Sequence, residues 1–296
     1  MRLLSFTIGN DPGYGIVVAN GVIDAGRRLG AYYPDLKSAL AADALVELHA
    51  LAADADADYS LSDIRFLPVI PNPDKIVCVG LNYLPHVEET GKELPKYPTL
   101  FVRFSASQVG HGEALVRPSV SGKFDFEGEL AVVICRRGRH IPVSGALRHV
   151  AGYACFNDGS IRDYQRHSSQ FTPGKNFASS GSFGPWLTTA EEIADPAQLT
   201  LETRLNGDVM QHASVADLIF SIPELISYCS TFTELMPGDV IVTGTPGGVG
   251  FARKPPVYMR PGDTIEVDID GIGVLRNGIV DEADTLRARN PDGPDV

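Results

Sequence analysis

The stretch that most constrains the fold is residues 124–134, which read Phe-Asp-Phe-Glu-Gly-Glu-Leu-Ala-Val-Val-Ile. Side chains alternate between the two faces of a strand, so this stretch predicts a strand with one apolar face. The opposite face would carry the carboxylates Asp125, Glu127 and Glu129. Residues 130–134 are wholly apolar, which is typical of a strand buried on both faces. We therefore expect the carboxylates to lie at the rim of a core, although a lone Glu-x-Glu pair more often marks a solvated strand face.

A third carboxylate, Asp158, follows another strand-like run at residues 152–156. On its own it is an ordinary turn aspartate, because Gly159 follows it. If it lies beside Glu127 and Glu129, the three form a cluster of hard oxygen ligands, which favours Mg²⁺ or Mn²⁺ and also allows Ca²⁺. Three protein ligands leave about half of an octahedral shell open for water and substrate. The competing interpretation is a structural Ca²⁺ ion in a closed shell, in a protein without catalytic activity.

Two further segments carry candidate catalytic groups. His86 and Glu89 are spaced one helical turn apart, after Pro85, a residue suited to the first turn of a helix. A lone histidine is more often a surface residue, but a neighbouring carboxylate holds the imidazole in one tautomer and raises its basicity, which suits a general base. Lys175 lies in a loop rich in proline and glycine. It is either a surface lysine or a cation that binds a carboxylate or an oxyanion in a pocket.

The glycine-rich run at residues 244–250 invites a nucleotide-binding interpretation. Pro255 and Pro256 follow shortly afterwards and prevent the helix that a phosphate-binding loop needs. The run therefore indicates a tight backbone loop that lines a pocket, with Thr245 as a hydrogen-bond donor. A serine nucleophile is not supported either, because the sequence has no Gly-x-Ser-x-Gly elbow.

Composition excludes several classes of partner. The chain of 296 residues has a net charge of −12, which argues against a nucleic acid or an anionic membrane. No apolar run approaches the roughly 20 residues of a membrane span, and the first apolar run is too short for a signal peptide. The four cysteines form no Cys-x-x-Cys pair, so we expect reduced thiols and a cytoplasmic location.

The chain divides into a small and a large unit. Residues 1–70 predict a small N-terminal α/β domain with a hairpin at Asn20-Gly21, and a proline-rich connector follows. Residues 71–282 form the expected catalytic domain, and residues 283–296 a flexible tail. Strands outnumber helices and do not alternate regularly with them, which argues against a doubly wound parallel sheet. The predicted fold class is α+β and mostly β.

Several segments resemble the fumarylacetoacetate hydrolase family, in the same order along the chain. They are residues 75–89, Glu127-x-Glu129, residues 157–165, Gly174-Lys175 and residues 238–250. The resemblance spans about residues 70–282. It implies a mixed β-sandwich roll in the second domain, a homodimer, and a divalent cation on Glu127, Glu129 and Asp158. It also places His86 and Glu89 as a catalytic pair on a short lid helix and Lys175 in the active site, and it sets near the metal or substrate Arg162, Gln165 and Thr245.

These observations lead to a hypothesis for function. We expect a metal-dependent hydrolase that cleaves a C–C bond in a small anionic 1,3-dicarbonyl, such as an acylpyruvate or a fumarylpyruvate. His86 would activate water, while Lys175 and Gln165 would steady negative charge. The alternative is a decarboxylase or isomerase of an oxo-dicarboxylate or a hydroxymuconate-type acid. Two segments depart from the family pattern near the pocket, Val102-Arg103-Phe104 and Gly159-Ser160-Ile161, and they bear on the substrate rather than on the metal site.

Overall fold

The computed structural model describes residues 1–289, and its fold is α+β with mostly strands, as the sequence predicts. Within this part of the chain, none of the helices is long and apolar enough to cross a membrane. All four cysteines are free thiols. The first elements are β1 (Arg2–Ile8), β2 (Asp11–Val18), β3 (Gly21–Asp24), α1 (Ala25–Leu29), α2 (Leu36–Ala41), α3 (Leu45–Asp54) and β4 (Arg65–Phe66).

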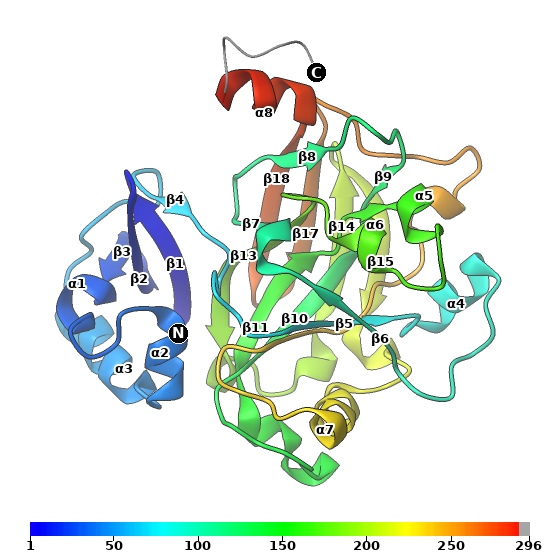
Figure 1. Cartoon of the computed structure of the whole chain (residues 1–296). Coiled ribbons are helices and arrows are strands. Elements are labelled where there is room, and N and C mark those ends of the chain that lie inside the picture. The colour runs from blue at the N-terminus through cyan, green and yellow to red at the C-terminus, as the bar shows by residue number, and fades with distance from the viewer. Residues whose placement is uncertain (290–296) are drawn as a thin grey trace.

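The larger part of the chain follows from β5 onward (Figure 1). Its strands are β5 (Ile76–Gly80), β6 (Thr99–Arg103), β7 (Gln108–Val109), β8 (Leu115–Arg117), β9 (Phe124–Asp125), β10 (Gly128–Ile134), β11 (Val150–Asn157), β12 (Ser160–Ile161), β13 (Gly181–Thr189), β14 (Thr200–Leu205), β15 (Asp208–Ser214), β16 (Val240–Val242), β17 (Thr264–Ile269) and β18 (Gly273–Asp281). Its α-helices are α4 (Leu84–Thr90), α5 (Arg162–Gln165), α6 (Thr172–Lys175), α7 (Ile222–Phe232) and α8 (Glu282–Arg289).

Two mixed sheets build the framework of the larger part. The first has the order β3-β2-β1-β13-β11-β10-β16-β5-β6, with β4 and β7 attached at its side. The second has the order β15-β14-β17-β18-β8, and β9 pairs with β12 separately. Most neighbours are antiparallel, but β5 pairs with β16 and β8 with β18 in parallel. This arrangement matches the mixed β-sandwich roll that the family resemblance implies.

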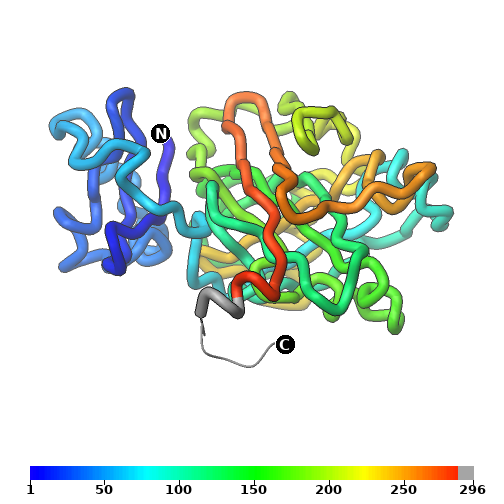
Figure 2. The backbone as a smooth tube through the Cα atoms, turned by 90° about the horizontal axis from the view of Figure 1, so that it is seen from above, coloured from blue at the N-terminus to red at the C-terminus, as the bar shows by residue number. Residues whose placement is uncertain are grey.

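The N-terminal segment lies at one end of an elongated molecule (Figure 2). The predicted β2–β3 hairpin forms, but its turn is Ala19-Asn20, one residue before the predicted Asn20-Gly21, because Gly21 already pairs with Val18. Strand β1 continues the large sheet by pairing with β13, and one buried apolar cluster extends from this segment into β10 and β11. The division at residue 70 stays a prediction. Towards the C-terminus of the chain, α8 occupies the first part of the predicted tail, and residues 290–296 lie outside the described residues.

Strand β10 is buried on both faces, as its apolar run predicts. Leu130 and Val132 pack into the cluster between the two sheets, which α7 also contacts. Ala131 and Val133 pack on the other side, in the cluster shared with the N-terminal segment. Burial on both sides fixes the register of this strand, because a shift by one residue would exchange its two faces. The strand is therefore a rigid support for the carboxylates at its start.

The predicted single strand over 124–134 is interrupted at Phe126 and Glu127, between β9 and β10. Side chains replace the missing ladder bonds there, since Asn157 Oδ1 accepts from Glu127 N at 3.1 Å and Gln211 Oε1 accepts from Gly128 N at 3.0 Å. A glycine is required at 128, because a Cβ there would lie 2.0 Å from the Thr203 hydroxyl on β14. The continuous alternation predicted for residues 124–134 is thus broken between β9 and β10.

Candidate active site

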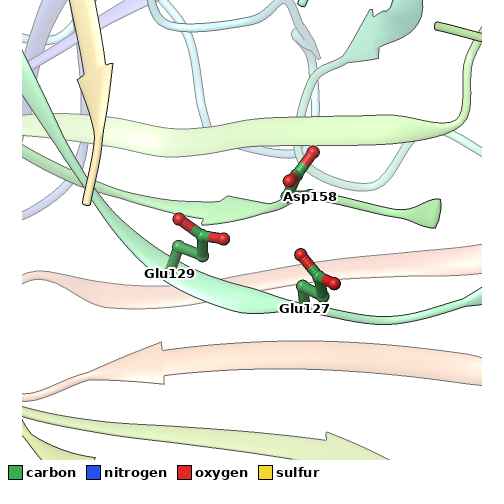
Figure 3. A group of neighbouring side chains, drawn as sticks. All are labelled: Glu127, Glu129 and Asp158. Carbon is green, nitrogen blue, oxygen red and sulfur yellow. The ribbon is translucent and has the colours of Figure 1, made fainter. Parts of the chain in front are cut away.

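Three carboxylates converge at the start of β10 and the end of β11. Glu127 lies just before β10, Glu129 lies on β10, and Asp158 follows the antiparallel neighbour β11, so that all three point into one space (Figure 3). One oxygen from each lies within 4.8 Å of the others, and all three residues are buried. The backbone holds this approach, because Asp158 N donates to the Glu127 carbonyl at 2.8 Å. The structure therefore brings together the three residues that the sequence proposes as metal ligands.

Three buried cations surround these carboxylates. Lys175 Nζ, from the end of α6, lies 2.6 Å from Glu127 Oε2 and 2.5 Å from Asp158 Oδ2. Arg162 Nη1 donates to Glu127 Oε1 at 2.6 Å, and Arg103 Nη1 lies 2.5 Å from Asp158 Oδ1. The alternative of a surface lysine at 175 is therefore wrong, because Lys175 is 1% exposed and bridges two candidate ligands.

The electrostatics of the cluster favour an additional cation. Burial raises the pKa of Glu129 well above its usual range, and the charges of Asp158 and Glu127 raise it further. Burial also acts on Glu127, but Lys175 and Arg162 outweigh it, so the pKa of Glu127 lies below its usual range. A divalent cation among the three carboxylates would offset the repulsion from Asp158 and Glu127 that contributes to the raised pKa of Glu129. The donor set is all oxygen, which fits Mg²⁺ or Mn²⁺.

A histidine–carboxylate pair lies on the wall of the same cavity. His86 is on α4, and its Nδ1 lies 2.8 Å from Glu89 Oε1. The cavity has a volume of about 130 Å³, and its lining includes His86, Glu127 and Glu129. An open space shared by these groups differs from the closed shell expected for a purely structural Ca²⁺ ion.

The glycine-rich loop at 244–250 is a backbone lining of the site, as the sequence predicts, and it donates to the acidic groups. Gly244 N donates to Glu129 Oε2 at 2.6 Å, and Gly248 N donates to Glu89 Oε2 at 2.8 Å. Gly244 has φ 111° and Gly248 has φ 103°, a conformation that favours glycine. The loop therefore holds a candidate metal ligand and the partner of the candidate base at the same time.

The remaining predicted residues also line the cavity, but their hydrogen bonds differ. Gln165 Oε1 accepts from Arg162 Nη1 at 2.9 Å, which directs its amide donors away from the arginine. Thr245 was expected to donate to a ligand, but its hydroxyl donates to the Gly128 carbonyl at 3.0 Å and accepts from Gln211 Nε2 at 2.7 Å. Thr245 therefore shapes the wall, while Gln165 keeps donors for a ligand.

Two functional residues have no assigned role in the sequence interpretation. Arg103, noted only as a departure from the family pattern, donates to Asp158, to the Gly159 carbonyl and to the Ser180 hydroxyl. Asp125 accepts from Arg162 Nε at 2.7 Å and from the backbone N–H groups of Gly250 and Phe251 at 2.9 Å. The signal was a charged residue after an apolar run for Arg103 and between two phenylalanines for Asp125, and such patterns are too common to be specific.

We expect replacement of Asp125 by asparagine to destabilise the protein by about 3–5 kcal/mol, because Arg162 would lose a buried ionic partner. Urea denaturation measures this. The matched control is Asp281→Asn, which removes one partner of a half-exposed pair with Arg117 and should change stability by about 0–1 kcal/mol. Equal effects of the two substitutions would show that Asp125 does not hold the site together.

Binding of a divalent cation should stabilise the fold without any substrate. A ligand at 100 times its Kd adds about 2.7 kcal/mol to the free energy of unfolding. We expect Mn²⁺ to raise the Tm and EDTA to reverse the increase, measured by thermal unfolding. A Tm that does not respond to Mn²⁺ or Mg²⁺ would contradict a metal site on the three carboxylates.

Comparisons with known proteins agree with this geometry. The sequence model of the protein family described as fumarylacetoacetate (FAA) hydrolase C-terminal matches residues 75–280. The mitochondrial oxaloacetate tautomerase FAHD2A of Homo sapiens is 39% identical over 293 residues, which cover 95% of this chain and 92% of the human protein.

Solved structures give the same result. The structure of maleylpyruvate hydrolase from Sphingobium sp. SYK-6, in complex with manganese(II) ion and pyruvate, has a TM-score of 0.79 at 28% identity and covers 95% of this chain and 99% of its own. The 5-carboxymethyl-2-hydroxymuconate delta-isomerase from Mycobacterium smegmatis has a TM-score of 0.75 at 29% identity, with the same coverage of 95% and 99%. The predicted resemblance is confirmed: this chain belongs to the fumarylacetoacetate hydrolase family of enzymes.

Proposed function

We propose that this protein is a Mg²⁺- or Mn²⁺-dependent hydrolase that cleaves a C–C bond in a 1,3-dicarbonyl acid of the acylpyruvate or fumarylpyruvate type. One observation carries the proposal: His86, whose Nδ1 lies 2.8 Å from Glu89 Oε1, lines one cavity together with the buried carboxylates Glu127 and Glu129. A cation held by Glu127, Glu129 and Asp158 would attract two substrate oxygens and stabilise the negative charge that develops on them.

His86 is the candidate general base. Glu89 Oε1 accepts a hydrogen bond from Nδ1–H, and in this tautomer Nε2 is free to accept the proton of a water molecule. The Gly248 N–H fixes the second oxygen of Glu89, which holds the pair in one orientation. His86 would later return the proton to the carbon at which the bond has broken, since the same nitrogen can donate what it has accepted.

Lys175 and Gln165 supply donors to the reacting oxygens. Burial lowers the pKa of Lys175, but Asp158 and Glu127 outweigh it and raise the pKa above its usual value, so the ammonium stays charged. A permanently charged lysine stabilises an oxyanion rather than acting as a base. The carboxylates of the cluster, with Asp125, outnumber the buried cations by one, so a divalent ion would leave the site net positive and suited to an anionic acid.

A second candidate function is keto–enol tautomerisation of an oxo-dicarboxylate. The specific observation that favours it is the full-length similarity to the human protein named oxaloacetate tautomerase. His86 would then take the proton from the enol oxygen and deliver it to the neighbouring carbon, which becomes the CH₂ beside the keto group, with no attack by water. Both reactions use the same charge stabilisation by Lys175.

The two candidates are separated by the fate of oxygen from water. Acetylpyruvate, fumarylpyruvate and oxaloacetate are incubated with the protein and Mn²⁺ in H₂¹⁸O, and loss of the enol is followed by its ultraviolet absorbance. Hydrolysis places ¹⁸O in a newly formed product carboxylate, whereas tautomerisation consumes the enol without C–C cleavage. Absence of both effects, with or without Mn²⁺ or Mg²⁺, would refute the proposed function.

A further inference from the structure

Two cations on the wall of the cavity have no role in the chemistry described above. Lys92 follows α4, and Arg166 follows α5. Both residues are exposed, and both line the cavity with His86 and Glu127. Among the described residues, no carboxylate forms an ion pair with either of them, in contrast to the buried cations Lys175 and Arg162.

The position of Arg166 is set by an aromatic ring that it shares with Arg162. Arg162 is the first residue of α5, and Arg166 immediately follows this short helix. Both guanidinium groups contact the ring of Phe251, with Cζ at 4.5 Å from the ring centroid for Arg162 and 4.7 Å for Arg166. The Phe251 N–H is fixed on Asp125 Oδ2 at 2.9 Å. The aromatic ring therefore supports Arg166 and orders its guanidinium before a ligand arrives.

The two arginines differ in what their donors do. Arg162 donates to Asp125, Glu127 and Gln165, inside the protein. Arg166 has no such acceptor among the described residues, although it faces the same cavity. A planar guanidinium that is ordered but unpaired suits a carboxylate, which it can bind through two parallel hydrogen bonds. Lys92, across the opening on the segment after α4, would add a second positive charge.

We propose that Arg166, with Lys92 as a second cation on the wall of the same cavity, binds a second carboxylate of the substrate, and that the protein therefore selects 2-oxo acids that carry two carboxylates. This inference rests on the proposed function for the orientation of the substrate. It narrows the substrate class to dicarboxylates and excludes simple acylpyruvates with an apolar end as the preferred substrates.

Binding of a ligand that is not turned over tests the inference without activity. Calorimetry in the presence of Mn²⁺ compares malate with its 4-methyl ester, in which a neutral ester replaces the second carboxylate. We expect the wild-type protein to bind malate about 10–100-fold more tightly than the ester, the range for a charge-assisted hydrogen-bonded pair. Arg166→Gln should abolish this preference, Arg166→Lys should restore part of it, and Lys92→Gln should reduce it less.

The matched control is Arg148→Gln, a change of the same charge on an exposed residue outside the cavity, which should leave the preference intact. Equal affinity of the wild-type protein for both ligands, or a preference that survives Arg166→Gln, would overturn the inference. If the preference behaves as expected while no 2-oxo acid is turned over, the proposed function fails and the carboxylate site stands.

Discussion

Replacing Glu129 by glutamine is expected to lower kcat/KM by about 10³-fold, because a bound divalent cation contributes several kcal/mol of charge stabilisation. Glutamine keeps the shape of the side chain, and its amide oxygen can still accept from Gly244 N. Burial and the charges of Asp158 and Glu127 raise the pKa of Glu129, so a neutral side chain at this position relieves repulsion within the cluster. The fold should therefore be preserved while one charged ligand is lost.

Calorimetric titration with Mn²⁺ checks this prediction directly. We expect the affinity of Glu129→Gln for Mn²⁺ to fall by at least about 10²-fold, and the Tm increase on adding Mn²⁺ to disappear at moderate concentration. Glu224→Gln, at an exposed position in the first turn of α7, is the control and should bind Mn²⁺ like the wild-type protein. Unchanged activity of Glu129→Gln in the presence of a chelator would refute a catalytic metal on these carboxylates.

Replacing His86 by asparagine is expected to lower kcat by about 10²–10⁴-fold, the usual contribution of a general base. His86 is not among the three acidic side chains that converge, so the Kd for Mn²⁺ should stay within a few-fold of the wild-type value. The loss should appear in kcat at saturating substrate and cation. A large change in Mn²⁺ affinity would instead identify His86 as a metal ligand.

Glu89 should act through His86, which a double substitution can show. Glu89→Gln keeps an acceptor for Gly248 N but no longer stabilises a charged imidazole, so we expect a smaller loss of kcat than for His86→Asn. In the double variant, the loss should equal that of His86→Asn alone, because residues that act as a unit are not additive. Additive losses would mean that Glu89 has an independent role.

The sequence predicts the acidic cluster because each carboxylate follows or begins a strand with a readable pattern. The apolar run of β10 predicts burial on two faces, and the strand before Asp158 pairs with it. The signal for the β2–β3 hairpin is equally local, because it depends only on Asn20-Gly21 and the short runs on either side. Features that depend on a few neighbouring residues can therefore be predicted from the sequence. The family resemblance adds the order of the segments.

The surroundings of the cluster could not be predicted in this way. Arg103 reaches Asp158 only because β6 pairs with β5, which lies beside β16 in the same sheet as β10. Asp125 changes its surroundings because β9 and β10 are separated, so that it accepts from the glycine-rich loop far along the chain. The free hydroxyl expected of Thr245 is consumed by Gly128 and Gln211 for the same reason. Long-range pairing decides these contacts, and no local pattern encodes it.

The loop at 244–250 has a consequence for how the substrate range of this protein can change. Its backbone amides donate to Glu129, a candidate metal ligand, and to Glu89, the partner of the candidate base His86, so one loop positions both groups. Arg166 and Lys92 lie outside this loop, on segments that follow short helices. We therefore expect substitutions of Arg166 or Lys92 to change which acid binds, while the His86–Glu89 pair keeps its orientation. If the proposed roles hold, selectivity and reactivity depend on different segments of the chain.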